Sequence, residues 1–84
     1  MKKNLQKLKL MANAYQAVQL EGNDYRNYFH HLSKILDEDN NCLIARLDSV
    51  ESNGYIIGAL DRITYEDGTF QHYYWVSPFA ERGL

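Results

Sequence analysis

The sequence predicts an α+β fold of the order ααβββ, in which a two-helix antiparallel hairpin packs on one face of a three-stranded antiparallel β-meander. Three observations lead to this prediction. Apolar residues recur at helical spacing through residues 5–36, β-compatible residues dominate residues 43–76, and the turn sequences Asn53-Gly54 and Asp67-Gly68 divide that second part. The 84 residues allow one domain. We assign it residues 1–84, with residues 1–3 and 78–84 as flexible ends.

The first helix is predicted in the segment before the turn sequence Glu21-Gly22-Asn23-Asp24. Its apolar side chains follow three- and four-residue steps that place them on one helical face: Leu5, Leu8, Met11, Tyr15 and Val18. Gly22 is the type of residue at which a helix commonly ends. Lys2 and Lys3 oppose the helix macrodipole, so we expect the first turn to fray.

The second helix has the strongest local pattern. Asp24 or Asn23 can cap its N-terminus, and its apolar stripe then consists of Tyr25, Tyr28, Phe29, Leu32, Ile35 and Leu36. Phe29 and Leu32 lie at the centre of this stripe, so both are predicted core residues. The polar link between the helices is short, which favours an antiparallel helical hairpin.

The strands are predicted over residues 43–50, 55–65 and 69–76, with Pro78 after the last. Asn53-Gly54 is the preferred sequence of a two-residue type I′ hairpin turn. Such a turn sets these residues opposite one another: Ser52 and Tyr55, Val50 and Ile57, Leu47 and Leu60, Arg46 and Asp61, Ala45 and Arg62, Ile44 and Ile63. The aliphatic pairs and the pair of opposite charges support this register.

The second hairpin has two readings. Asp67-Gly68 forms a two-residue turn, or Glu66-Asp67-Gly68 forms a three-residue turn with a bulge. The choice decides which of the three consecutive aromatic residues Tyr73, Tyr74 and Trp75 point toward the helices.

Composition limits where the protein acts. The single cysteine, Cys42, excludes an internal disulfide, which fits a reducing compartment. No apolar run has the length of a secretion signal core or a membrane span. We therefore expect a cytoplasmic protein with no membrane partner. The net charge of −2 conceals a basic first half and an acidic second half.

The acidic run Asp37, Glu38 and Asp39 suggests a cation site only in part. Asp37, Asp39 and Asn41 have the spacing that opens an EF-hand calcium loop. The loop also needs glycine and glutamate at positions where this chain has Cys42 and Asp48. We expect a solvated acidic loop instead. Because acids oppose the dipole at a helix C-terminus, a basic partner would stabilise it, and the three acids are secondary interaction candidates.

Other catalytic or metal-binding arrangements are missing from the sequence. His30 and His31 are adjacent on a helix and diverge by about 100°, so they cannot easily share a metal. No Cys-x-x-Cys or His-x-x-x-His spacing occurs. Cys42 follows an acidic run, which disfavours a reactive thiolate. We therefore expect no enzyme activity, no metal and no cofactor.

The predicted sheet favours a protein partner. Two helices on one face leave the other face uncovered, yet apolar residues are predicted on both faces. A spare apolar face indicates self-association or a partner site, unless the segment 79–84 folds back and covers it.

The third predicted strand is the expected interaction element. As the last strand of a meander it would be an edge with unpaired backbone groups, and it carries four aromatic residues: Phe70, Tyr73, Tyr74 and Trp75. We therefore expect a homodimer that forms through this edge, or a protein partner that packs on its aromatic residues. We expect a small regulatory protein, of the kind that phages and mobile elements encode to inhibit host machinery. Nucleic-acid-associated regulation or an antitoxin-like role is the alternative, ranked lower because the strands carry few cations.

Overall fold

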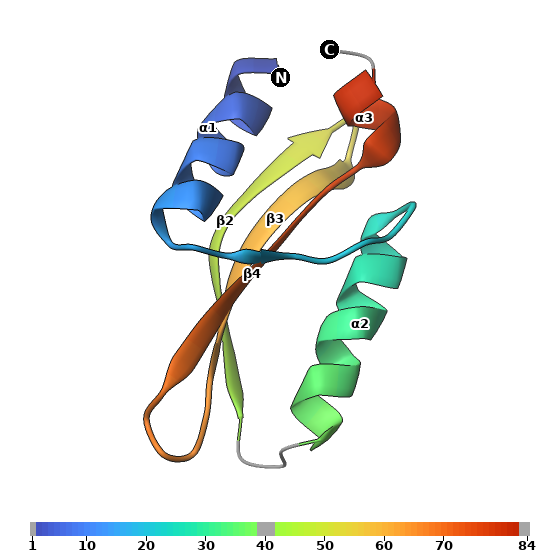
Figure 1. Ribbon diagram of the computed structural model, residues 1–84. Coiled ribbons are helices and arrows are strands. Elements are labelled where there is room, and N and C mark those ends of the chain that lie inside the picture. The colour runs from blue at the N-terminus through green and yellow to red at the C-terminus, as the bar shows by residue number, and fades with distance from the viewer. Residues whose placement is uncertain (1, 39–41, 83–84) are drawn as a thin grey trace.

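The computed structural model describes residues 2–38 and 42–82 and has an α+β fold with three helices and a mixed four-stranded sheet (Figure 1). The elements are, in chain order, α1 (Lys2–Ala14), β1 (Val18–Gln19), α2 (Tyr25–Glu38), β2 (Leu43–Ser52), β3 (Tyr55–Thr64), β4 (Phe70–Val76) and α3 (Pro78–Arg82). The strand order is β1-β4-β3-β2, and β1 runs parallel to β4 while the other pairs are antiparallel. The predicted α+β class and antiparallel meander are confirmed, and β1 and α3 are additions to the predicted ααβββ order.

Helix α1 is shorter than predicted, because it ends at Ala14 and not near Gly22. Gln16 adopts a left-handed φ of 55°. Its N–H donates to the carbonyl of Asn13 at 3.0 Å, and the N–H of Ala17 donates to Ala12 at 2.8 Å. These two bonds form a Schellman motif, which usually has glycine at the left-handed position. Glutamine there gives no sequence signal for a helix end, and the residues after it form β1.

Helix α2 begins as predicted, with the Asp24 carboxylate accepting the N–H of Asn27 at 2.9 Å. Tyr28 and Leu32 are fully buried. Phe29 is 43% exposed, so its predicted place in the core is wrong. It lies at the border of the apolar stripe, where the centre of its ring is 5.9 Å from that of the Tyr25 ring.

The two long helices cover opposite faces of the sheet, so the predicted helical hairpin on one face is wrong. Leu5 and Leu8 of α1 pack in one cluster with Leu60, whereas Tyr28 and Leu32 of α2 pack in another with Ala59. Neighbouring residues of a strand point to opposite faces. The chain between the helices runs beside β4 as strand β1, at the edge of the sheet, and thereby passes from one face to the other (Figure 1). Each helix therefore covers its own apolar face.

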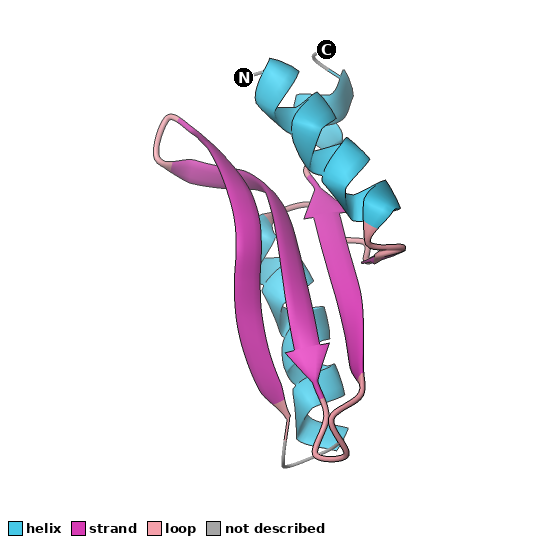
Figure 2. Cartoon of the chain, turned by 90° about the vertical axis from the view of Figure 1, so that its left-hand side faces the viewer, coloured by secondary structure: helices cyan, strands magenta, loops and turns pink. Residues whose placement is uncertain are grey.

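The helices also lie at opposite ends of the sheet. Figure 2 shows α2 behind the strands, while α1 and α3 lie at the upper end. Gly58 marks the close approach of α1, because a Cβ there would come within 2.6 Å of the Leu8 side chain. At the lower end of the same face, beside the β3–β4 loop, no described helix lies in front of the strands (Figure 2).

The first hairpin confirms the predicted turn and most of the register. Asn53 and Gly54 have φ values of 52° and 82°, as a type I′ turn requires. Ser52 pairs with Tyr55, Arg46 with Asp61, Ala45 with Arg62 and Ile44 with Ile63. From Asp48 to Val50 the register of β2 against β3 is displaced by one residue.

Two bulges cause this displacement, and they compensate each other. Leu60 pairs with Asp48 and not with Leu47, and Val50 pairs with Gly58 and not with Ile57, so those two predicted pairs are wrong. Leu47 and Ile57 are the extra residues, and both pack against the cluster under α1. The bulges turn two additional aliphatic side chains toward that core.

The second hairpin has the three-residue turn, the second of the two predicted alternatives. Thr64 pairs with Phe70, the N–H of Tyr65 donates to Thr69 at 2.8 Å, and Gly68 has a φ of 89°. In the resulting register Tyr73 and Trp75 pack with the α2 cluster, and Tyr74 packs with the α1 cluster.

The segment after β4 contains a short helix. Helix α3 follows Ser77, whose carbonyl accepts the N–H of Glu81 at 3.0 Å. Lys9 and Glu81 form an ion pair that holds α3 against α1. Lys2 and Lys3 belong to α1. None of the described helices is long and apolar enough to cross a membrane.

Candidate protein-interaction site

The four aromatic residues predicted as interaction residues have different environments. Trp75 is 1% exposed, stacks on Tyr28 at 5.7 Å between ring centroids, and donates its indole N–H to the carbonyl of Gly22. The Tyr74 hydroxyl donates to Gln19 at 3.0 Å. Of the four, only Phe70 is an exposed side chain, at 58%.

Tyr73 is partly buried as well. Its hydroxyl oxygen lies 3.4 Å from that of Tyr65. Burial, together with this hydrogen bond, raises the pKa of Tyr73 to about 12. The hydroxyl therefore stays protonated at neutral pH and belongs to the packing under α2.

Strand β4 is not the sheet edge that the sequence predicted. Tyr73 and Tyr74 pair with Val18 and Gln19 of β1, and the N–H of Leu20 donates to the carbonyl of Tyr74 at 2.9 Å. The prediction failed because β1 was read as the end of the first helix. A homodimer through the β4 edge therefore loses its geometric basis.

The acidic candidates lie at and beyond the end of α2. Asp37 and Glu38 are the last residues of this helix. Asp39 lies outside the described residues, as do Asn40 and Asn41, so the predicted acidic interaction loop stays a prediction. In the ranges 2–38 and 42–82, no group of three or more His, Cys, Asp or Glu side chains is placed to hold a metal ion.

Exposed large apolar side chains occur at several places in the described chain, and two of them, Leu43 and Phe70, lie at the uncovered end of the α1 face. We call this end the open half-face, and it consists of Leu43, Ala45, Arg62, Thr64 and Phe70. Leu43, Thr64 and Phe70 form one row across β2, β3 and β4, and Ala45, Arg62 and His72 form the next. Leu43 is 73% exposed, so the first row has a large exposed side chain at each end.

Arg62 and His72 form a polar centre within this surface. The Arg62 Nε–H donates to Nε2 of His72 at 3.2 Å, and the guanidinium carbon lies 5.4 Å from the centre of the Phe70 ring. Tyr15, at the end of α1, stacks on His72 at 4.6 Å. His72 is only 5% exposed. Burial lowers the pKa of His72, and the charge of Arg62 lowers it further, so its imidazole is neutral at pH 7.

The open half-face adjoins a free strand edge. Strand β2 is the outermost of the three long strands. Its residues 43–46 are all exposed, and they precede the bulge at Leu47. Edges are commonly protected by lysine, proline or bulges. The segment 43–46 has none of these, and no strand of the described residues pairs with the outer side of β2.

A second polar cluster lies under α2 and is structural. The Asp61 carboxylate, 1% exposed, accepts bonds from Arg46 Nε at 2.8 Å, Arg46 Nη2 at 3.0 Å and the Tyr28 hydroxyl at 2.7 Å. Arg46 also donates to the Tyr25 hydroxyl at 2.8 Å. Burial and the bond to Asp61 raise the pKa of Tyr28. The predicted pairing of Arg46 with Asp61 is correct, but the two tyrosines reach it only through the packing of α2.

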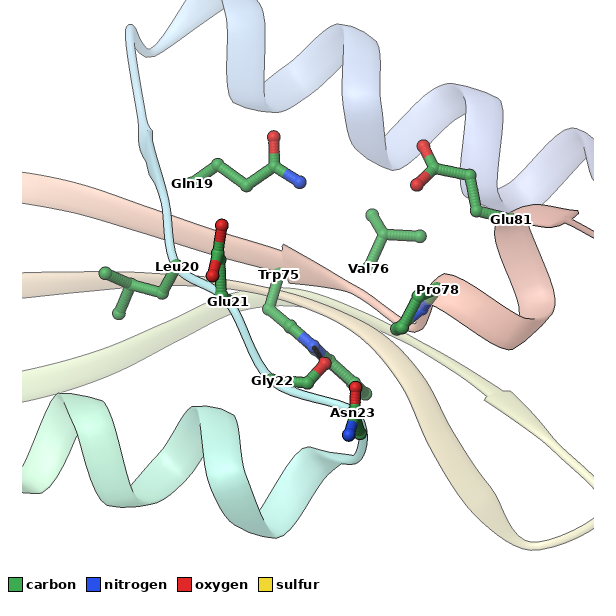
Figure 3. Close-up of a pocket in the computed structure, with 9 residues that line it drawn as sticks. All are labelled: Gln19, Leu20, Glu21, Gly22, Asn23, Trp75, Val76, Pro78 and Glu81. Atoms are coloured by element: carbon green, nitrogen blue, oxygen red, sulfur yellow. Dashed lines mark hydrogen bonds between the residues drawn. The ribbon is translucent and has the colours of Figure 1, made fainter.

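Two of the hollows in the described surface lie near the start of α2. One, of about 280 Å³, lies between the link into α2 and α3, and Figure 3 shows the Trp75 indole along its floor beside Gly22. The Trp75 N–H donates to the carbonyl of Gly22, and the Glu81 carboxylate forms an ion pair with Lys9. The other, of about 560 Å³, lies between the start of α2 and the β2–β3 turn, with Tyr55 and Ile56 in its wall.

No known protein family matches this chain, and no curated protein or solved structure shows significant similarity to it.

Proposed function

We propose that this protein acts by protein–protein interaction, and that its open half-face and the adjoining edge of β2 form the contact surface. The observation that carries the proposal is the row Leu43, Thr64 and Phe70, which spans three strands and has an exposed apolar side chain at both ends. Leu43 and Phe70 lie on either side of the partly buried Thr64, and exposed apolar side chains that gather on one face of a small protein indicate a binding site.

Burial of this row against a partner would stabilise the complex. Burial of apolar surface contributes about 25 cal/mol per Å², and aromatic residues such as Phe70 are frequent anchors of interfaces. A neighbouring free edge adds backbone hydrogen bonds, as in β-strand addition between proteins. The surface thus combines an apolar anchor with a template for pairing.

A regulatory or inhibitory role fits this kind of surface, with no catalytic step of its own. The chain has one domain, and its polar groups under α2 are engaged in holding the helix to the sheet. Such a protein acts by covering part of a larger one. The proposed role of a phage or mobile-element inhibitor is of this type and is kept as a proposal.

The test is capture of a partner from a lysate of the source cells by the tagged full chain. Phe70→Lys and Leu43→Lys are expected to lose a partner that the wild type retains. Leu10→Lys and Phe79→Lys are matched controls, because these apolar residues are exposed to a similar degree but lie on α1 and α3.

The pattern of loss decides the outcome. Loss in both half-face variants with retention in both controls supports the proposal. A partner that all four variants retain, or that the controls lose equally, refutes the open half-face as the contact surface.

A further inference from the structure

The hydrogen bonds of β3 show which way each of its backbone groups points. In an antiparallel sheet, residues whose N–H and C=O groups point toward one neighbouring strand alternate with residues whose groups point toward the other. Tyr65 donates its N–H to the carbonyl of Thr69, so at this residue the backbone groups point toward β4. The preceding residue, Thr64, therefore directs its groups toward β2, and Arg62 does the same two residues earlier.

The far edge of the sheet gives the same alternation. The carbonyl of Tyr74 accepts the N–H of Leu20, so Tyr74 turns its backbone groups toward the β1 side and away from β3. Its partner on β3 is Leu60, which accordingly directs its groups toward β2. Leu60 and Arg62 are two residues apart, so both ends of β4 agree.

The outward backbone groups of the β2 edge therefore belong to Ile44 and Arg46. Leu43 and Ala45 pair with the β3 residues that point toward β2, so they use their own groups on β3. Ile44 and Arg46 point the other way, and both are exposed. In Figure 2, β2 is the strand at the left, and no described helix or strand lies beyond it.

This edge is complementary to a second copy of itself. Two identical strands can pair antiparallel about a two-fold axis. If Ile44 of each copy pairs with Arg46 of the other, all the outward groups of both residues are used, and Ala45 lies opposite Ala45 of the second copy on the axis. Residues in such a non-hydrogen-bonded pair come closest, at about 4.5 Å between Cα atoms, and alanine is small enough for that position.

Leucine side chains flank this axis on the face that α1 covers. Leu43 and Ala45 lie at the open end of that face, and Leu47 packs in the cluster under α1. In the register centred on Ala45, Leu43 of each copy lies beside Leu47 of the other. Leu43 is 73% exposed in the single chain, so this contact removes apolar surface from water twice.

The neighbouring registers are less favourable. In the register centred on Ala45, Ile44 lies opposite Arg46 on the α2 face, where the aliphatic stem of the arginine can cover it while the guanidinium stays on Asp61. An axis at Arg46 would set two arginines of like charge opposite one another. An axis at Ile44 would lose both contacts between Leu43 and Leu47.

We propose that two copies of this chain pair antiparallel through residues 43–46 of β2, with Ala45 on the two-fold axis. The two four-stranded sheets then join into one, and the open half-faces of both copies lie on the same side of it. This inference rests on the proposed function, because it assigns the β2 edge to self-association and leaves the joined half-faces to a further protein.

The first experiment is sedimentation equilibrium of the full chain from about 10 μM to about 1 mM, a range suited to the weak dimer that so short a contact forms. The wild type is expected to change from monomer to dimer across this range. Ile44→Pro removes an outward N–H without removing a bond to β3, and is expected to stay monomeric. Ile44→Val keeps the N–H and should dimerise as the wild type does. Thermal melts show whether each variant is folded.

The second experiment locates the axis by crosslinking. A separation of about 4.5 Å between Cα atoms lies within the range that a disulfide spans. Ala45→Cys, oxidised with copper–phenanthroline, is therefore expected to form a covalent dimer. The wild type, which has Cys42 alone, and Glu51→Cys, at an exposed position of the same strand, should form much less.

Three results would overturn the inference. They are a wild type that is monomeric at about 1 mM, a dimer that Ile44→Pro retains, and crosslinking of Ala45→Cys that is no faster than that of Glu51→Cys. A monomeric wild type whose captured partner is lost in Ile44→Pro would make a strand of another protein the occupant of the edge.

The proposed function fails separately. A dimer that depends on Ile44, with no partner captured through Phe70, supports this inference and refutes the function. A partner that depends on Phe70 and binds a chain that is monomeric throughout does the reverse.

Discussion

Replacement of Arg46 by methionine tests how the fold holds the fully buried Asp61 carboxylate. Methionine keeps the unbranched stem of arginine but removes both guanidinium bonds to Asp61, which leaves that carboxylate with the Tyr28 hydroxyl as its described donor. Removal of one partner from a buried ion pair typically costs 3–5 kcal/mol. The Arg46 side chain is 32% exposed, so solvent offsets part of the loss and we expect about 3 kcal/mol. That is a large part of the stability of a small domain.

The assay is urea unfolding at pH 7, followed by the fluorescence of Trp75, which is the single tryptophan and stacks on Tyr28. A second substitution, Asp61→Asn, removes the charge that Arg46→Met leaves unpaired. The double variant is therefore expected to be more stable than Arg46→Met alone by at least about 1 kcal/mol. Arg26→Met, at an exposed position of α2, is the matched control and should change stability by less than about 0.5 kcal/mol. A loss below about 1 kcal/mol for Arg46→Met, or no recovery in the double variant, would refute the reasoning.

Three further predictions concern single positions. In the same urea assay, Leu32→Ala should lower the free energy of unfolding by about 2–5 kcal/mol, while Phe29→Ala, at a 43% exposed position of the same helix, should lower it by less than about 1 kcal/mol. Equal losses of unfolding free energy in the two variants would contradict the placement of α2. Gly54→Val should cost about 1–3 kcal/mol, because a β-branched side chain at a φ of 82° is strained even though the site has open space, and an unchanged melting temperature would exclude the type I′ turn. The lowered pKa of His72 means that the folded state binds this proton less readily than the unfolded state does, so the group contributes stability that is complete above pH 6.5 and is lost as the pH falls through its folded pKa. The melting temperature of His72→Gln should therefore fall less between pH 7.5 and pH 5 than that of the wild type. His30→Gln, at an exposed position, should follow the wild type.

The sequence by itself determined those features that depend on contacts a few residues apart. Helix α2 begins where Asp24 caps it, and the β2–β3 hairpin turns where Asn53 and Gly54 tolerate positive φ. The pairing of Arg46 with Asp61 follows from the length of that turn. Each is decided by local backbone and side-chain chemistry, which a sequence displays directly.

The sequence indicated only part of the surface that we propose for interaction. The reasoning from aromatic content selected the strand that contributes Phe70, but it also selected Trp75, which tertiary packing buries against Tyr28. It did not find Leu43 or Arg62 as surface residues. A strand pattern shows which residues share a face, but not where along the face a helix stops covering it.

Tertiary structure alone decided the side of the sheet that each helix covers. That choice depends on Gln16, whose left-handed conformation ends α1 early and releases Val18 and Gln19 to pair with β4. Formation of this short parallel strand takes the chain around the edge of the sheet, so that each apolar face is covered in part by its own helix. No local pattern encodes that outcome, because the free energy that favours it comes from surfaces brought together across the whole chain, and the same arrangement leaves Leu43, Arg62 and Phe70 at the end that α1 does not reach.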